Sequence, residues 1–311
     1  AERRLGVSKL TVPPPPLLFL EQPHILLIDG MALLFRSFYA TAPMRQFFPR
    51  QDGTPTNGVQ GFARHVLSAQ NIVRPTHMAV CWDMGSHTFR NDLFDGYKAN
   101  RTAPPEEMLP QFDMARDVSE MIGWKNFGVK GQEADDLIGS IVEKWKNDAQ
   151  ITVVSGDKDL LQLVNPNTTI ALTKKGYTEY NPYNLARFTE EYGISPAQFA
   201  DVKAFMGDSS DGYPGVKGIG PKTALQLIKT YGSVDGVLAA LAELKPGQRQ
   251  KISDNVDMLQ LSLQLARINT AVPIDASMDE LLLPMWTNDT LDLMHQHEYR
   301  LIANHALNIF K

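Results

Sequence analysis

Three of the short apolar runs in this sequence end in an aspartate, and these residues are Asp29, Asp83 and Asp157. Short β-rich runs alternate with longer helical patterns from residue 24 onward, which predicts a parallel sheet with crossover helices. The carboxyl ends of parallel strands meet at one edge of the sheet, where such folds bind their ligands. Any one of these aspartates could simply begin the turn after its strand, but the three together predict a shared acidic site.

A second acidic group, Glu133-Ala134-Asp135-Asp136, opens a predicted helix whose apolar residues recur at helical spacing. Carboxylates at a helix N-terminus are stabilised by the helix dipole, which is the simpler explanation of their position. Three acids within four residues nevertheless repel one another and raise one another's pKa unless a cation lies among them. A metal ion is the simplest cation that meets this need.

The motif Ser-Gly-Asp-Lys-Asp-Leu-Leu places Asp157 and Asp159 together where a predicted strand ends. A calcium loop is excluded, because apolar residues follow where further oxygen ligands would be required. We therefore expect this pair to join the acidic site and to need the same compensation by a cation.

A glycine-rich turn lies between two predicted helices in the stretch from Tyr192 to Leu241. Its glycines are spaced G-x-x-G-x-G, which differs from the dinucleotide-binding fingerprint, and no predicted strand precedes them. Exposed backbone amides beside Lys217 and Lys222 suit contact with a phosphate backbone of any sequence. Taken alone, the turn could equally be an ordinary connection between two helices.

The composition is that of a globular protein. Of the 311 residues, 43% are hydrophobic and 21% are charged, which excludes disordered, collagen-like and coiled-coil classes. The single cysteine, Cys81, allows no intrachain disulfide and no zinc cluster, so we expect a reduced, cytoplasmic compartment. No apolar run approaches the roughly 18 residues of a membrane helix. Residues 1–22, with Pro13 to Pro16, are interpreted as a flexible tail or an artificial remnant outside the fold.

Taken in order, these motifs resemble the 5′ nuclease family: the N-terminal nuclease domain of bacterial DNA polymerase I, its stand-alone relatives, phage 5′ exonucleases and flap endonucleases. The resemblance runs from about Ile25 to about Leu301. The segments that carry it are Leu27–Gly30, Trp82-Asp83, Phe89-Arg90, Tyr97–Arg101, Glu133–Asp136, Ser155–Asp159, Gly207–Asp211 and Pro214–Gly220. Because no polymerase or proofreading domain is evident up to Lys311, the chain looks most like the stand-alone proteins or an excised nuclease domain.

The resemblance implies an α/β fold, with a PIN-like or resolvase-like parallel sheet, flanking helices, a helical arch and a helix-three-turn-helix subdomain. We expect residues 23–190 to form the catalytic domain, including the arch at about 84–120. Residues 191–311 would form the DNA-binding helical subdomain and the C-terminal helices.

The resemblance also implies two divalent metal sites. Asp29, Asp83, Glu133 and Asp135 would hold the first metal, with Asp136 nearby, and Asp157, Asp159, Asp208 and Asp211 would serve the second. Oxygen ligands suit Mg²⁺ or Mn²⁺, and two such ions can promote phosphodiester hydrolysis. Removing these nine acids from the 35 leaves 26 against 30 Lys and Arg, so the remaining surface is about +4 although the net charge is −5. The acidic net charge therefore does not exclude DNA.

DNA contacts are implied in three places. Lys98 and Arg101 in the arch would contact the scissile phosphate, a charge role without proton transfer. Arg90 and Tyr97 in the arch, and Arg36 and Tyr39 after the first aspartate, would contact the strand, although Arg90 also suits a solvated helix face. The turn contacts are expected at Gly215, Val216, Lys217, Gly218, Ile219, Gly220 and Lys222.

A K⁺ ion bound by the carbonyls of that turn would be a further cofactor. The chain departs from the family at Gly212-Tyr213, where an asparagine and an aliphatic residue are common. Glycine there loses a side chain and gains backbone freedom, which puts the loop geometry in question.

The expected function is that of a metal-dependent 5′-3′ exonuclease and flap endonuclease that leaves 5′-phosphates. Its partners would be DNA with 5′ flaps, nicks or free 5′ ends, RNA-primed ends included. We expect a cytoplasmic, nucleoid-associated monomer without membrane contact, which a polymerase or sliding clamp could recruit. Two alternatives are a branched-DNA-binding module with little catalysis and a PIN-like ribonuclease.

Overall fold

A six-stranded sheet forms the centre of the computed structural model, which describes residues 22–310. The predicted tail, residues 1–22, lies outside the described residues except for Gln22. The strand order is β3-β2-β1-β4-β5-β6, and β6 is antiparallel to β5 while the other four pairs are parallel. The strands are β1 (His24–Asp29), β2 (His77–Trp82), β3 (Lys125–Gly128), β4 (Gln150–Ser155), β5 (Thr168–Thr173) and β6 (Tyr180–Tyr183). The predicted α/β class is confirmed.

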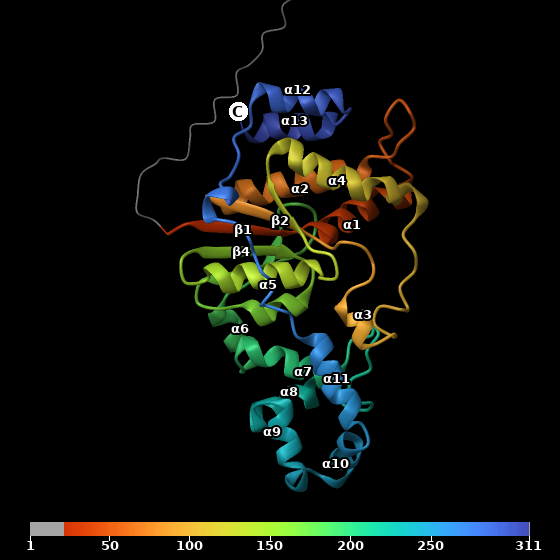
Figure 1. Ribbon diagram of the computed structural model, residues 1–311, viewed down its shortest axis with the longest axis vertical. Helices are drawn as coiled ribbons and strands as arrows, with labels where there is room; N and C mark the ends of the chain where they lie inside the picture. Colours follow the sequence, from red (N-terminus) through yellow and green to blue (C-terminus); the bar gives the residue numbers. More distant parts are fainter. Residues whose placement is uncertain (1–21, 311) are drawn as a thin grey trace, which may run out of the picture.

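Helices cover both faces of the sheet because its central strands are apolar on both sides. In β1, Leu26 and Ile28 face one core, whereas Ile25 and Leu27 face the other. The first core lies under α1 (Gly30–Thr41), α2 (Asn57–Val73) and α4 (Leu109–Ile122), and the second under α5 (Ala134–Trp145) (Figure 1). The acids that start α1 and α5 are therefore presented at the same edge.

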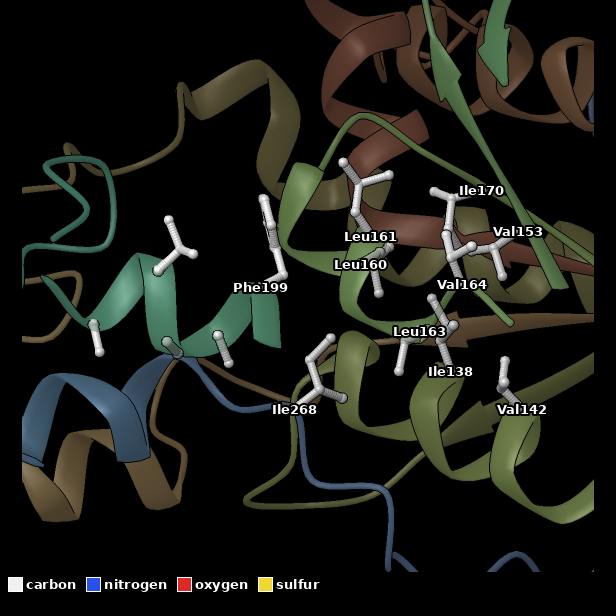
Figure 2. Packing of buried hydrophobic residues seen from close by; sticks show 14 of the residues in the cluster. Ile138, Val142, Val153, Leu160, Leu161, Leu163, Val164, Ile170, Phe199 and Ile268 are labelled. Carbon is white, nitrogen blue, oxygen red and sulfur yellow. The ribbon is translucent and has the colours of Figure 1, made fainter. Parts of the chain in front are cut away.

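A helical subdomain continues the second core away from the sheet. Phe199 and Ile268 pack beside Leu160, Leu161 and Ile138 of the α/β part (Figure 2). Its helices are α6 (Leu185–Tyr192), α7 (Phe199–Met206), α8 (Pro221–Tyr231), α9 (Val234–Ala239), α10 (Pro246–Ser253) and α11 (Val256–Ala266). Short 3₁₀ turns complete the chain: η1 (Ala42–Met44), η2 (Glu106–Met108), η3 (Lys158–Leu163), η4 (Pro196–Gln198), η5 (Leu241–Glu243) and η6 (Met278–Leu281).

The C-terminal helices return to the α/β part of the molecule. Helices α12 (Asn288–Gln296) and α13 (Arg300–Ile309) lie at the end of the molecule opposite α8–α10 (Figure 1). Tyr299 and Ile302 are buried in the core beneath α2, and Ser68 of α2 is hydrogen-bonded to His305 at 3.0 Å. The predicted second part, residues 191–311, contains both the helical subdomain and these C-terminal helices, which pack on the α/β part. Apolar burial against α2 is the physical reason.

The arch expected over residues 84–120 is only partly helical. It contains the five-residue helix α3 (Phe89–Leu93), a stretch of turns and coil over residues 94–105, and then η2 and α4. Gly96 and the pair Pro104-Pro105 oppose helix formation in that stretch. Helix α4 packs on α2, so the segment that overhangs the acidic edge is α3 with residues 94–105.

No helix in the described range 22–310 has the length and apolar character needed to span a bilayer.

Candidate active site

The strand-end aspartates lie together at the carboxyl edge of the sheet. Asp29 ends β1, Asp83 follows β2, and Asp157 lies two residues beyond β4. The Ser155 hydroxyl donates to Asp29 at 2.7 Å and ties β4 to β1. Backbone N–H groups donate to Asp29, Asp83 and Asp157, respectively, from Ala32 at 3.3 Å, Ala134 at 2.8 Å and Asp159 at 2.8 Å. Within the described chain, none of these three carboxylates has an ion-pair partner.

A second group of carboxylates comprises Asp159 of η3 with Asp208 and Asp211 of the loop after α7. Their oxygen atoms lie within 4.8 Å of one another, close enough to share one metal ion. The loop holds its own geometry, because the Asp211 N–H donates to the Asp208 carboxylate at 2.9 Å. The α/β part and the helical subdomain thus each supply ligands to this cluster.

Lys203 of α7 was not among the predicted site residues. Its ammonium lies 3.1 Å from Asp159 and 2.6 Å from Asp208, and its side chain is 13% exposed. The only signal in the sequence was its position five residues before Asp208, which places it on the helix that leads into the acidic loop. Lys203 gives this cluster one positive charge against three negative ones.

Glu133, the residue that caps α5, is surrounded by donors. Lys98 and Arg90 form ion pairs with it, and the Tyr97 hydroxyl donates to it at 3.0 and 3.1 Å. Burial raises the pKa of Glu133, but Lys98 and then Arg90 outweigh that effect and hold it below its ordinary value. The negative charge of Glu133 is therefore compensated by two cations.

Arg90 does not face solvent, which overturns its predicted DNA contact. The residue is 3% exposed, and its guanidinium makes two 2.8 Å bonds to Asp136, which is fully buried. It also donates to the carbonyls of Leu265 at 3.0 Å and Arg267 at 2.8 Å. The physical reason is burial, because charged groups that are excluded from water need hydrogen-bond partners within the protein.

The same contacts remove Asp136 from the proposed metal ligands. Besides Arg90, its carboxylate accepts the N–H groups of Glu133 at 3.0 Å and Asn269 at 2.8 Å. Tyr97, expected to stack on a strand, is 4% exposed and uses its hydroxyl on Glu133. Asp136 and Tyr97 are both buried, and both are hydrogen-bonded to Glu133.

Lys98 and Arg101 line a cavity of about 740 Å³ beside the acids. Asp83 and Glu133 form its acidic wall, and Phe35 is among the apolar side chains that line it. Arg101 is half exposed and lies 3.0 Å from Asp211. The two cations could pair with the phosphate of a phosphodiester that enters this cavity.

The loop that carries Asp211 is locked to the arch segment. The Lys98 N–H donates to the Asp211 carbonyl at 2.6 Å, and Asn100 donates to the Ser209 carbonyl at 2.9 Å. Gly212 has φ +81°, and a Cβ there would lie 2.6 Å from the Gly96 carbonyl oxygen. The absence of a side chain at Gly212 thus permits the close approach.

We expect Gly212→Ala to displace residues 96–101 and to lower the cleavage rate by roughly 10-fold to 100-fold, because small misplacements near reacting atoms are costly. Single-turnover cleavage of a 5′-flap substrate would measure it. Gly232→Ala is the matched control, since Gly232 has φ +85° but nothing within 4 Å of the added Cβ. Equal rates for the two variants would contradict the role of this contact.

Most other acids at the site have raised pKa values, chiefly because burial disfavours their charged forms. Burial and then Asp83 raise the pKa of Asp29 to about 7, and burial and then Asp157 raise that of Asp159 to about 7. Asp83, Asp135 and Asp211 are also raised, again chiefly by burial. The acids at the site outnumber the cations beside them, so a further positive charge would stabilise their charged forms. Carboxylate oxygens are the ligands that hard divalent ions such as Mg²⁺ prefer.

This electrostatic state predicts a pH dependence of metal stabilisation. Since the folded-state pKa of Asp29 and Asp159 lies above the unfolded value, the metal-free protein loses stability as pH rises from about 4 to about 7. Buried His65, with its pKa lowered to about 4 by burial, acts in the opposite direction with or without metal. We therefore expect the increase in Tm caused by Mg²⁺ relative to EDTA to grow from about pH 5 to about pH 8. A constant increment in thermal melts would contradict it.

The glycine-rich turn lies between α7 and α8. Val216 and Ile219 are buried, 1% and 4% exposed, so their predicted DNA contacts are limited to backbone atoms. Gly215 is buried with φ +61°, whereas Lys217, Gly218, Gly220 and Lys222 are exposed. On α1, Tyr39 is 49% exposed and Arg36 is partly exposed, and their DNA contacts stay predictions.

A resolvase-like α/β sheet with clustered carboxylates at its carboxyl edge, beside a cation-lined cavity, defines the class of a nuclease. The chain matches the family model "5′-3′ exonuclease, N-terminal resolvase-like domain" over residues 24–193. It matches "5′-3′ exonuclease, C-terminal SAM fold" over residues 194–289. The protein belongs to the 5′-3′ exonuclease family of phosphodiester hydrolases.

Individual relatives agree with this assignment. A 5′-3′ exonuclease of Bacillus subtilis (strain 168) is 47% identical over 276 residues, covering 89% of this chain and 93% of that protein. DNA polymerase I of Rhizobium leguminosarum is 39% identical over 84% of this chain, which spans 26% of that protein. A structure of the bacteriophage T5 D15 flap endonuclease with DNA and metal ions is 22% identical, with a TM-score of 0.63 over 92% of this chain and 99% of that one.

Proposed function

We propose that this protein removes 5′ ends from DNA with two divalent metal ions, cutting at single-strand to double-strand junctions and at free 5′ ends to leave 5′-phosphates. The observation that carries the proposal is the carboxylate cluster of Asp159, Asp208 and Asp211, together with a cavity that Lys98 and Arg101 line beside the strand-end acid Asp83. The bacteriophage T5 flap endonuclease, which has the same fold, was crystallised with DNA and metal ions, and this supports it.

The donor set fits two ions. Asp29, Asp83 and Asp135, with Glu133 beside them, would hold the first, and Asp159, Asp208 and Asp211 the second, with Asp157 placed between the groups. Asp136 is excluded because Arg90 and backbone N–H groups occupy its carboxylate. When bound, such ions supply Lewis acidity to an attacking water and to the leaving oxygen at phosphorus.

The chain's own cations act on the phosphate. Lys98 and Arg101 would offset the negative charge that develops on the phosphoryl oxygens in the transition state. Glu133 holds the Lys98 ammonium, and Asp211 holds the Arg101 guanidinium, at the cavity wall. Neither cation needs to transfer a proton.

Duplex DNA would lie along the glycine-rich turn. Lys217 and Lys222 are exposed beside it and would pair with backbone phosphates, which gives affinity without sequence preference. We assign K⁺ binding to the carbonyls of this turn and a single strand to the cavity under α3. The protein would act on DNA in the cytoplasm as a monomer that a polymerase or clamp can recruit, and its relatives include a 5′-3′ exonuclease of a bacterium.

The test uses a 5′-flap DNA, a matched blunt duplex and an RNA duplex, each labelled internally. With Mg²⁺ we expect cleavage near the flap junction, 5′-phosphate products and little RNA cleavage, and with EDTA no cleavage. Tight flap binding without cleavage in Mg²⁺ or Mn²⁺ would overturn the proposal and indicate a branched-DNA-binding protein. Preferred cleavage of RNA would indicate a ribonuclease.

A further inference from the structure

Tyr213 has a buried hydroxyl with no protein partner. The residue is 2% exposed, and its Oη has no hydrogen-bond partner among the described residues. Leaving a buried hydroxyl unpaired costs about 1–3 kcal/mol. Such groups in proteins are ordinarily satisfied by protein or ordered water, so this one points to a bound species.

The backbone places this side chain beside the second carboxylate cluster. Asp208 and Tyr213 form an antiparallel bridge and exchange both N–H···O bonds, at 2.9 and 3.2 Å. Residues directly opposite each other in such a pair have their side chains on the same face. Asp159, Asp208 and Asp211 are the charges that act most strongly on the Tyr213 hydroxyl. Tyr213 belongs to the second core and, through the bridge to Asp208, extends from the same face of the loop as the Asp208 carboxylate.

A neutral phenol can donate one hydrogen bond and accept others. Tyr213 makes no direct hydrogen bond to the carboxylates of the cluster in the described part of the chain. A water molecule held between the hydroxyl and an ion at the cluster would satisfy both. Hydrogen bonds to the groups that ligate a metal ion orient those ligands. Removing such a bond typically lowers the affinity of the protein for the metal by roughly 10-fold to 100-fold.

We propose that Tyr213 is a positioning residue for the divalent metal at Asp159, Asp208 and Asp211, acting through a water molecule bound to its hydroxyl. The inference rests on the proposed function, because it requires that this cluster binds a metal ion.

Tyr213→Phe removes the hydroxyl alone and tests the proposal by Mn²⁺ titration in a calorimeter, without DNA. We expect the Mn²⁺ site at Asp159, Asp208 and Asp211 to lose affinity by roughly tenfold or more. Without metal, the variant should be as stable as the wild type or more stable, because an unpaired buried hydroxyl is gone. Tyr192→Phe, which lies against the same core, is the matched control and should change neither quantity.

A third variant distinguishes metal binding at the cluster from the role of Tyr213. Asp159→Asn should abolish one Mn²⁺ site, the one at this cluster, in both the wild-type and the Tyr213→Phe background. If Asp159→Asn leaves Mn²⁺ binding unchanged, the cluster is not a metal site and the proposed function fails. If Asp159→Asn removes the site but Tyr213→Phe leaves its affinity unchanged, or if Tyr213→Phe destabilises the metal-free protein, the role of Tyr213 alone is overturned.

Discussion

Replacing both Asp157 and Asp159 by asparagine is expected to reduce flap cleavage by about 10³-fold or more while flap binding persists. Two charges disappear from the second carboxylate group, and the transition state then loses electrostatic stabilisation of the kind that is worth about 10²–10³ per interaction. The asparagine at position 157 can still accept a hydrogen bond from the backbone N–H of residue 159. The N-terminal cap of η3 is therefore kept, and η3 should form as before. Single-turnover cleavage and a separate binding titration measure the two effects.

The control for this variant removes the same charge elsewhere. Asp148→Asn with Asp275→Asn changes two exposed acids and should leave cleavage unaltered. Without metal, the Asp157 and Asp159 variant should be at least as stable as the wild type, because two neighbouring carboxylates that repel each other are removed. Cleavage within tenfold of the wild-type rate would show that this group does not serve catalysis.

Replacing Arg90 by methionine should lower the free energy of unfolding by about 3–5 kcal/mol, because Asp136 would be left buried and unpaired. The carbonyls of Leu265 and Arg267 would also lose their donors, which loosens the segment after α11. Urea denaturation in EDTA measures the effect. A DNA contact at Arg90 would instead weaken flap binding and leave stability unchanged.

The double variant Arg90→Met with Asp136→Leu distinguishes an ion-pair effect from a loss of packing. Replacing a buried pair by apolar groups of similar size is often neutral, so much of the lost stability should return. If the double variant is no more stable than Arg90→Met alone, the packing of the arginine stem, rather than the unpaired charge, explains the loss.

The α/β fold could be predicted from the sequence because it depends on local patterns. Apolar runs with aspartates at their ends specified β1, β2 and β4, and the geometry of parallel strands then required the aspartates to share an edge. Helix α5 likewise begins at the acidic motif that suggested it. Such signals lie within a few residues of the element they specify, so no knowledge of remote packing is needed.

The tertiary structure alone decided which cation meets which acid. Arg90 pairs with Asp136, 46 residues away in sequence, and Lys203 pairs with Asp159 from a separate subdomain. Over residues 94–105 there is no helical or strand period to indicate which side chains face inward, so the burial of Tyr97 could not be read from its neighbours. The packing of α12 and α13 near α2 could not be predicted either, because the apolar face of a helix can pack against many different surfaces. Elements follow from local patterns, whereas ion pairs between distant segments depend on how those elements pack, and that packing places the charges of this site.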